Sequence, residues 1–299
     1  MEEIVLSPYG YELQNGLLVQ SDTGEVIPYS VMALPEKSTV NTPLEKERKR
    51  KWAEEMEAHA KKVRSNNPFV FVKKELNFVG VPPAMATRLI YLSTYMQYDG
   101  NKLMLSTRKA MTRKDIADVL GISPRNAVNF WDCLHPAFIT EDSTGALILN
   151  EEIFKRGKRG RGNRIPYERV FQNGVRKLYE SAYGKYHKQM GYLFELLPYI
   201  SIEYNVLCRN PYEKDIQNVE LLSIAEFCKL IGYSLENIDK LRKIYSTIRF
   251  PVGDHRELFC KMIYDGVHSN DAIVCINPNI LYSGSNPRRI EISKLYFSK

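Results

Sequence analysis

The chain has 299 residues, and 44% of them are hydrophobic, 26% charged and 11% aromatic. This composition excludes a disordered chain, and the length allows about two domains. The net charge of +7 suits a polyanionic partner, although an excess of this size does not demand one.

Several other features are missing from the sequence. The five cysteines form no CxxC pair, so we expect reduced thiols rather than a zinc site or a disulfide framework. The N-terminus has neither a basic start nor an apolar core, and no run reaches the ~18 apolar residues of a membrane span. We therefore expect a cytoplasmic protein with no membrane partner, no metal and no cofactor.

The first 68 residues divide into a small β element and a charged segment. Turn signals recur in residues 1–35 with short apolar runs between them, which predicts a β-meander or hairpin. After a linker at 36–43, residues 44–64 have a helix-favouring composition of mixed charge. We interpret this segment as a solvated helix, and the alternative is an arm that touches phosphates.

Two further elements precede the most informative part of the chain. Residues 69–81 have the composition of a strand. In residues 84–98 apolar side chains recur at spacings of three and four, which predicts a buried helix.

A helix-turn-helix pattern occupies residues 111–134. Thr112 is a candidate cap with Asp115 as its partner, Gly121 ends the first short helix, and Ser123 caps the second. We expect the second helix to bury Ala127, Val128, Trp131 and Leu134. The outward-facing side chains are then Arg125, Asn126 and Asn129.

A hairpin and a basic run follow this pattern. Residues 137–140 and 146–149 predict two short strands joined by a turn at 142–145, and a helix-turn-helix followed by such a hairpin is a winged-helix arrangement. Six basic residues interleaved with glycine come next: Lys155, Arg156, Lys158, Arg159, Arg161 and Arg164. A charge run is often only a solvated surface, but this one has no acidic neighbour, which favours nucleic acid.

The second half of the chain repeats the plan. Residues 175–200 predict one or two helices, and residues 222–244 predict a second helix-turn-helix. We align residues 232–234 with 121–123, and residues 224–226 with 115–117. Strands expected at 258–264 and 272–276 complete a second wing, and residues 277–299 end in a short strand or helix.

Residues 112–134 and 222–244, with the helix-leading segments before them and the stretch 195–214, carry a resemblance to a known family. The chain resembles the paired winged-helix DNA-binding proteins of Gram-positive phages and plasmids, which include replication initiators and repressors. The resemblance covers about residues 69–280. It implies DNA binding and does not decide between an initiator and a regulator.

A helix-turn-helix places its second helix in the major groove of DNA, which assigns roles to the side chains. Arg125 would bind guanine, Asn126 and Asn129 would bind adenine, and Asn237 would read bases in the second unit. Phosphate contacts are expected from Arg113, Lys114, Lys155, Arg156, Lys158, Arg159, Arg161, Arg164, Lys240, Arg242 and Lys243. The second unit is the weaker candidate because acidic residues lie near its surface.

Enzyme motifs are missing, so we expect no catalysis. There is no GxxxxGK[ST] loop, GxSxG elbow or HExxH helix. A tyrosine-recombinase-like protein is an alternative because Tyr296 follows Arg249, Arg256, Arg288 and Arg289, although the His-x-x-Arg pair is absent. A helix-turn-helix that serves only as a protein-interaction module is another.

Together these patterns predict an α+β, mainly α fold. An N-terminal element at residues 1–68 would precede two tandem winged helix-turn-helix domains at 69–165 and 166–299. The expected function is sequence-specific binding of double-stranded DNA by a nucleoid-associated transcription regulator of a phage or other mobile element, and the alternative is a replication initiator that binds origin repeats. A homodimer or a host replication or transcription protein is a further possible partner.

Overall fold

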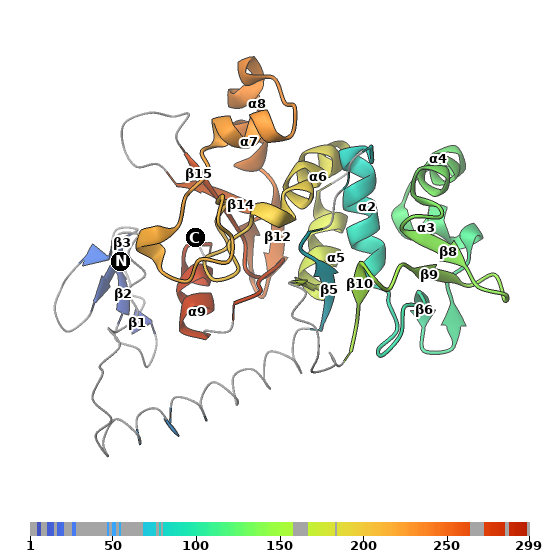
Figure 1. Cartoon of the computed structure of the whole chain (residues 1–299), viewed down its shortest axis with the longest axis horizontal. Coiled ribbons are helices and arrows are strands. Elements are labelled where there is room, and N and C mark those ends of the chain that lie inside the picture. Colours follow the sequence, from blue (N-terminus) through green and yellow to red (C-terminus); the bar gives the residue numbers. More distant parts are fainter. Residues whose placement is uncertain are drawn as a thin grey trace.

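The computed structural model describes residues 68–75, 78, 80–157, 167–182, 184–263, 272–284 and 287–297, four short strands before residue 28, and four positions between residues 47 and 54. In these regions helices combine with small antiparallel sheets, which confirms the expected α+β class (Figure 1). No helix in the described part of the chain is both long and apolar enough to cross a bilayer.

The N-terminal strands form the expected meander. Strands β1 (Val5–Leu6), β2 (Tyr11–Gln14), β3 (Leu17–Gln20) and β4 (Val26–Ile27) pair in sequence order. In the charged segment Glu47, Arg50, Lys51 and Glu54 are helical and exposed. The Lys51 Nζ lies 3.4 Å from Glu47 Oε1 and the Arg50 Nε lies 3.6 Å from Glu54 Oε1, pairings that are typical of a solvated helix.

The rest of the described chain consists of two structural repeats, at residues 69–155 and 167–281. The first contains β5 (Phe69–Lys73), α2 (Pro83–Ser93), β6 (Met104–Ser106), β7 (Lys109–Ala110), α3 (Ile116–Leu120), α4 (Pro124–Leu134), β8 (Ile139–Glu141), β9 (Leu147–Leu149) and β10 (Phe154–Lys155). A 3-10 turn, Arg113–Asp115, leads into α3.

The second repeat follows a similar order, with an additional helix after its leading strand and an additional hairpin. It contains β11 (Tyr167–Phe171), α5 (Gln172–Ser181), α6 (His187–Glu195), α7 (Ile224–Leu230), a 3-10 turn at Leu235–Asn237, α8 (Ile238–Tyr245), β12 (Arg249–Val252), β13 (His255–Leu258), β14 (Cys260–Ile263) and β15 (Ile273–Ile276). Helix α9 (Pro287–Leu295) follows it.

Matching backbone hydrogen bonds define the repeats. Leu103 N donates to Leu147 O at 2.8 Å, and in the second repeat Leu207 N donates to Val274 O at 3.1 Å. Four further pairs of backbone N–H to O bonds correspond in the same way, the bond of the first repeat being given before that of the second. They are Met104 to Tyr95 with Cys208 to Tyr199; Met111 to Leu103 with Leu222 to Leu207; Leu149 to Asn101 with Ile276 to Asn205; and Lys73 to Ile153 with Phe171 to Ile280.

Asparagine side chains hold the same positions in both repeats. Asn101 Nδ2 donates to Leu149 O at 3.0 Å, as Asn205 Nδ2 does to Ile276 O at 3.2 Å. After the last hairpin strand, Asn150 Nδ2 donates to Ala137 O and Asn277 Nδ2 to Leu258 O, both at 2.9 Å. Each amide therefore satisfies backbone groups where a hairpin meets the rest of its repeat.

The leading strands of the repeats pair with each other. Strands β5 and β11 are antiparallel with Phe71 opposite Arg169, and β10 pairs with the outer edge of β5. Leu281 forms the equivalent bridge to β11. An antiparallel pair has a local two-fold axis, and the equivalent bonds on both sides place this axis between Phe71 and Arg169. The two repeats are thus related by a pseudo-two-fold axis.

Helices α2 and α6 meet near this axis. The Thr87 hydroxyl donates a buried 2.7 Å hydrogen bond to His187 O. The equivalent contact brings Gly191 against Pro83, and a Cβ at position 191 would lie only 1.8 Å from Pro83 O. The close approach of the two helices therefore requires glycine at this position.

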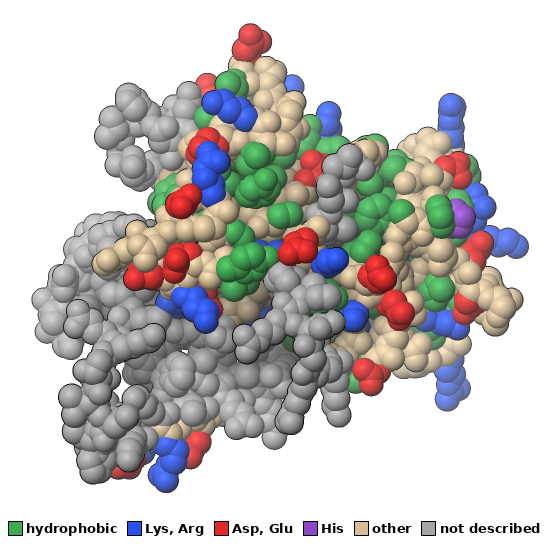
Figure 2. All heavy atoms as spheres, viewed as in Figure 1, with side chains coloured by type: hydrophobic (Ala, Val, Ile, Leu, Met, Phe, Trp, Pro, Cys, Tyr) green, Lys and Arg blue, Asp and Glu red, His purple; other side chains and the backbone are tan. Residues whose placement is uncertain are grey.

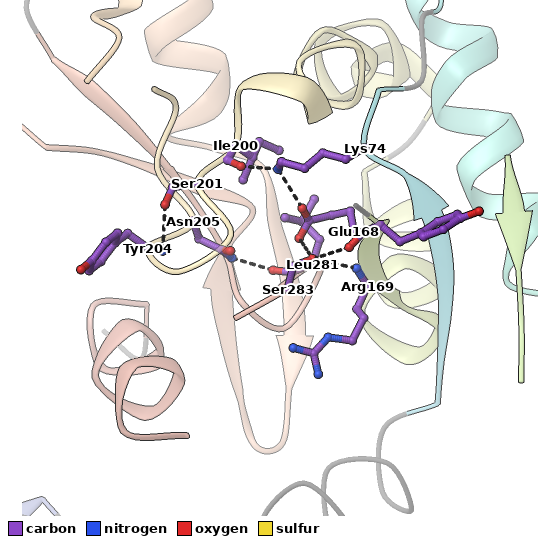
Figure 3. Close-up of polar contacts among 10 residues, drawn as sticks. Lys74, Glu168, Arg169, Ile200, Ser201, Tyr204, Asn205, Leu281 and Ser283 are labelled. Atoms are coloured by element: carbon purple, nitrogen blue, oxygen red, sulfur yellow. Dashed lines mark hydrogen bonds and ion pairs between the residues drawn. The ribbon is translucent and has the colours of Figure 1, made fainter. Parts of the chain in front are cut away.

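A buried ion pair also joins the repeats (Figure 3). The Lys74 Nζ, at the end of β5, lies 3.1 Å from Glu168 Oε2 on β11, and both side chains are fully buried. Lys74 also donates to Ile200 O, and the Ser283 hydroxyl donates to Glu168 Oε1 at 2.7 Å. Each charge thus has a second polar partner, as a buried ion pair requires.

Three sequence expectations need correction. The hairpin β12–β13 was not expected, and like α5 it has no counterpart among the described elements of the first repeat. The capping pairs equate Glu226 with Asp115, so the alignment of residues 224–226 with 115–117 was wrong by two positions. Val128 is 48% exposed, and Phe130 instead contributes to the buried face of α4, because positions 127, 130, 131 and 134 share one side of that helix.

Candidate nucleic-acid interface

The turn between α3 and α4 has the expected geometry. Gly121 adopts the left-handed conformation with φ of 60°, which favours glycine. Ile122 N donates to Ala117 O at 3.0 Å, and the Ser123 hydroxyl accepts a 3.3 Å bond from Asn126 N. These contacts fix the direction in which α4 leaves the turn.

A capping box fixes the start of the same unit. Thr112 N donates to Asp115 Oδ2 at 2.8 Å, and the Thr112 hydroxyl donates to the same oxygen at 2.6 Å. The hydroxyl bond from Thr112 is the main reason that the pKa of Asp115 lies below its usual value. The carboxylate therefore stays charged near neutral pH and holds this end of the helix pair.

The outer face of α4 carries the predicted base-reading residues. Arg125, Asn126 and Asn129 are all exposed, as is Val128, which the sequence analysis had placed in the core. Arginine and asparagine are the side chains that bind guanine and adenine in pairs of hydrogen bonds, and an apolar side chain suits the thymine methyl group. Val128 is thus a candidate contact that sequence reasoning missed.

Arg113 is held against α4. Its guanidinium lies 4.9 Å from the centre of the Trp131 ring, and its Nη2 lies 4.0 Å from Asp132 Oδ1. The Trp131 ring is in turn stacked on His135. Arg113 and Lys114 are both exposed, so their charges are available beside the α4 face.

The hairpin β8–β9 has the predicted strands and turn. Asp142 Oδ1 accepts from Thr144 N at 2.8 Å and from Ala146 N at 3.1 Å, and Lys102 Nζ lies 2.7 Å from Asp142 Oδ2. The Lys102 ammonium, followed by the Thr144 donors, holds the pKa of Asp142 well below its usual range. The turn is therefore ordered by local bonds.

The basic run begins inside the described region and continues beyond it. Lys155 is exposed on β10, whereas Arg156 is half-buried and donates to Met96 O, so Arg156 ties the end of the first repeat to the segment that follows α2. Lys158, Arg159, Arg161 and Arg164 lie outside the described residues.

The second helix-turn-helix has the same framework. Gly232 has φ of 64°, and Tyr233 N donates to Cys228 O at 2.8 Å. Ser223 and Glu226 form its capping box. The backbone bond from Ser223 is the main reason that the pKa of Glu226 lies below its usual value, and Arg209 forms an ion pair with the same carboxylate. The charge of Glu226 is therefore compensated.

Some polar residues of the second unit are exposed, and one of the predicted phosphate-binding residues instead forms an ion pair within the unit. Asn237, Lys240 and Lys243 are exposed. Arg242 is half-buried, and its Nη1 donates to Asp239 Oδ1 at 2.9 Å. The turn also exposes two leucines, Leu230 and Leu235, at 44% and 46%.

The two helix-turn-helix units differ in charge at equivalent positions. With Gly121 and Gly232 superposed, Asn126 corresponds to Asn237, but Arg125 corresponds to Glu236. Asn129 corresponds to Lys240, and Val128 to Asp239. Figure 2 shows a basic side chain protruding beside α4 and an acidic one protruding at the tip of the second unit.

The recombinase alternative has little geometric support. Burial raises the pKa of the Tyr296 phenol to about 12, which is opposite to the activation that a nucleophile needs. Arg289 is buried and its Nη1 donates to Glu203 Oε2 at 3.0 Å, and Arg256 donates to the backbone of Arg249.

Both helix-turn-helix units lie along one edge of the molecule, the upper edge in Figure 1, with the α2–α6 pair between them. The predicted base-reading residues of the first unit all belong to α4, whereas Asn237 lies in the 3-10 turn before α8 and the predicted phosphate-binding residues of the second unit lie on α8. No known protein family, curated protein or solved structure matches this chain.

Proposed function

We propose that this chain binds double-stranded DNA sequence-specifically through two winged helix-turn-helix units. The observation that carries the proposal is the outer face of α4, where exposed Arg125, Asn126 and Asn129 follow a glycine turn and a serine cap. A helix of this kind enters the major groove, and these side-chain types discriminate between bases there.

The surroundings of α4 support the same proposal. Arg113 and Lys114 stand beside it, where they would meet phosphates, and the β8–β9 hairpin would act as the wing. The basic run from Lys155 to Arg164 would add salt-sensitive affinity with little sequence choice.

The proposed biological role is that of a transcription regulator of a phage or other mobile element, associated with the nucleoid. A replication initiator is the alternative, and both would bind DNA in the same way. Affinity selection of fragments from the source genome separates them. Sites that overlap promoters would support the regulator, and a clustered array of repeats would support the initiator.

The DNA-binding proposal itself is tested by selecting duplexes from a random pool with the wild-type chain and with Arg125→Ala. We expect a defined motif for the wild type and loss of preference at one base for the variant, at a cost of about 1–3 kcal/mol. Arg108→Ala is the matched control because Arg108 is also exposed, in the β6–β7 turn at the opposite end of the repeat. Absence of any enriched motif would refute the proposal.

A protein-interaction module is a second candidate function, and one observation favours it. Leu230 and Leu235 are exposed on either side of the second turn, where a DNA-reading unit usually presents polar groups. In that case the chain would bind DNA duplexes no more tightly than other proteins of similar positive charge do.

A further inference from the structure

The pseudo-two-fold axis limits how the two units can meet one duplex. Two helix-turn-helix units related by a two-fold axis match half-sites that are inverted, because the symmetry of the target follows the symmetry of the reader. Here the axis passes between Phe71 and Arg169 and between α2 and α6. Helices α4 and α8 lie along the same edge of the molecule, with α2 and α6 between them (Figure 1). One molecule therefore presents both helices to the same side.

The symmetry of the backbone is broken by the side chains. Asn126 and Asn237 are both exposed at equivalent positions, so both can pair with the N6 and N7 atoms of adenine. The preceding position is Arg125 in one unit and Glu236 in the other, and both are exposed. Arginine donates to guanine O6 and N7, whereas a carboxylate accepts from the N4 amine of cytosine.

A glutamate on a DNA-facing surface is repelled by the phosphates. This cost is offset only where its carboxylate accepts a hydrogen bond from a donor on the DNA. In the described part of the chain Glu236 forms no ion pair, whereas Arg209 pairs with Glu226 and Arg242 pairs with Asp239. Lys240 and Lys243 are exposed on α8, which begins directly after the 3-10 turn that contains Glu236, and they would hold the DNA backbone on either side. This arrangement suits a base contact by Glu236 and phosphate contacts by the lysines.

We infer that one molecule reads a single bipartite site whose two half-sites are inverted and unequal. They share an adenine, contacted by Asn126 and Asn237, and differ at the neighbouring base, which is guanine opposite Arg125 and cytosine opposite Glu236. This inference rests on the proposed function and adds to it the orientation and the base composition of the target.

The test is selection from a random duplex pool with the full chain and with Glu236→Arg. For the wild type we expect two inverted half-sites with the guanine and cytosine difference. For Glu236→Arg we expect guanine to replace cytosine in one half-site only, with the other unchanged. Affinity of the variant for the wild-type site should fall about 10- to 100-fold, and the matching change of that one base should restore it.

Glu180→Arg is the matched control, because it makes the same change of charge at an exposed position on α5, below α2 and α6 in Figure 1. It should leave the selected motif unchanged. A wild-type motif with one half-site, or with two in the same orientation, would overturn the inference while leaving the proposed function intact. So would an unchanged motif for Glu236→Arg. Failure to select any motif would instead remove the proposed function.

Discussion

Lys74 and Glu168 form an ion pair with a nitrogen to oxygen distance of 3.1 Å, although the two residues are 94 positions apart in the sequence. Both side chains are fully buried; Lys74 directly follows β5 and Glu168 lies on β11, the two strands that join the repeats. Their effect on the stability of this junction can be measured.

Lys74→Met would leave the Glu168 carboxylate buried with the Ser283 hydroxyl as a remaining partner. We expect a loss of about 3–5 kcal/mol in the free energy of unfolding, measured by denaturant titration. The double variant Lys74→Met, Glu168→Gln should recover much of this loss because no unpaired charge remains. Lys177→Met, at an exposed position of α5, is the control. The prediction would be contradicted if Lys74→Met and Lys177→Met lowered the free energy of unfolding equally.

Gly191→Ala tests the contact between α2 and α6. Within a helix this substitution usually stabilises by about 0.5–1 kcal/mol, but here the new Cβ would lie 1.8 Å from the Pro83 carbonyl oxygen. Because that atom belongs to the backbone, we expect the opposite sign and a loss above about 2 kcal/mol in thermal or denaturant unfolding. Gly184→Ala has nothing within 4 Å of its Cβ and should change stability little. Stabilisation by Gly191→Ala would show that the helices separate easily.

Glu195 gives the stability a pH dependence of known sign. Burial raises the pKa of this carboxyl from 4.5 to about 7, and its Oε1 has no hydrogen-bond partner in the described part of the chain. The folded state therefore holds the proton more tightly than the unfolded state. The free energy of unfolding should fall as pH rises from about 4.5 to about 7.

Glu195→Gln should remove this slope. The variant should match the wild type near pH 4 and exceed it by about 1 kcal/mol at pH 8, a figure reduced for screening because the side chain is only half-buried. Unfolding curves at a series of pH values provide the measurement, and Glu180→Gln, which is exposed, serves as the control. A slope that persists in Glu195→Gln would assign it to another group.

The basic run makes a prediction about salt. Replacing Lys158, Arg159 and Arg161 together with alanine should weaken binding to every duplex and lower the slope of log affinity against log salt concentration by about 2 to 3. Fluorescence anisotropy titrations at several salt concentrations would measure this. A change of base preference, with the slope unaltered, would mean that these residues read bases rather than phosphates.

Local signals made much of the helix-turn-helix unit predictable. A cap, a glycine and a proline act on their immediate neighbours, and for this reason the roles of Thr112, Gly121 and Ser123 were correctly inferred. The position of Val128 was not, since an apolar residue on a short helix is usually assigned to the core and only the register with Phe130 and Trp131 decides otherwise.

Long-range features were not predictable from local patterns. The pairing of β5 with β11 depends on two short strands far apart in the sequence, and nothing near either strand specifies its partner. Hairpin β12–β13 has a weak sequence signal because Pro251 lies within its first strand, and proline is unfavourable in most strands. The role of Gly191 depends on Pro83 in another helix and leaves no local signal.

The pseudo-two-fold core has a consequence for how occupancy would depend on protein concentration. If both helix-turn-helix units bind DNA, the second contact is intramolecular, at an effective concentration fixed by the folded core rather than by the amount of protein in solution. Occupancy of a bipartite site would then rise hyperbolically, with a Hill coefficient of one and no dimerisation threshold. The close contact of Gly191 with Pro83 would also fix the distance and the orientation between the two units. Inserting half a helical turn of DNA between the half-sites would therefore leave only one unit bound.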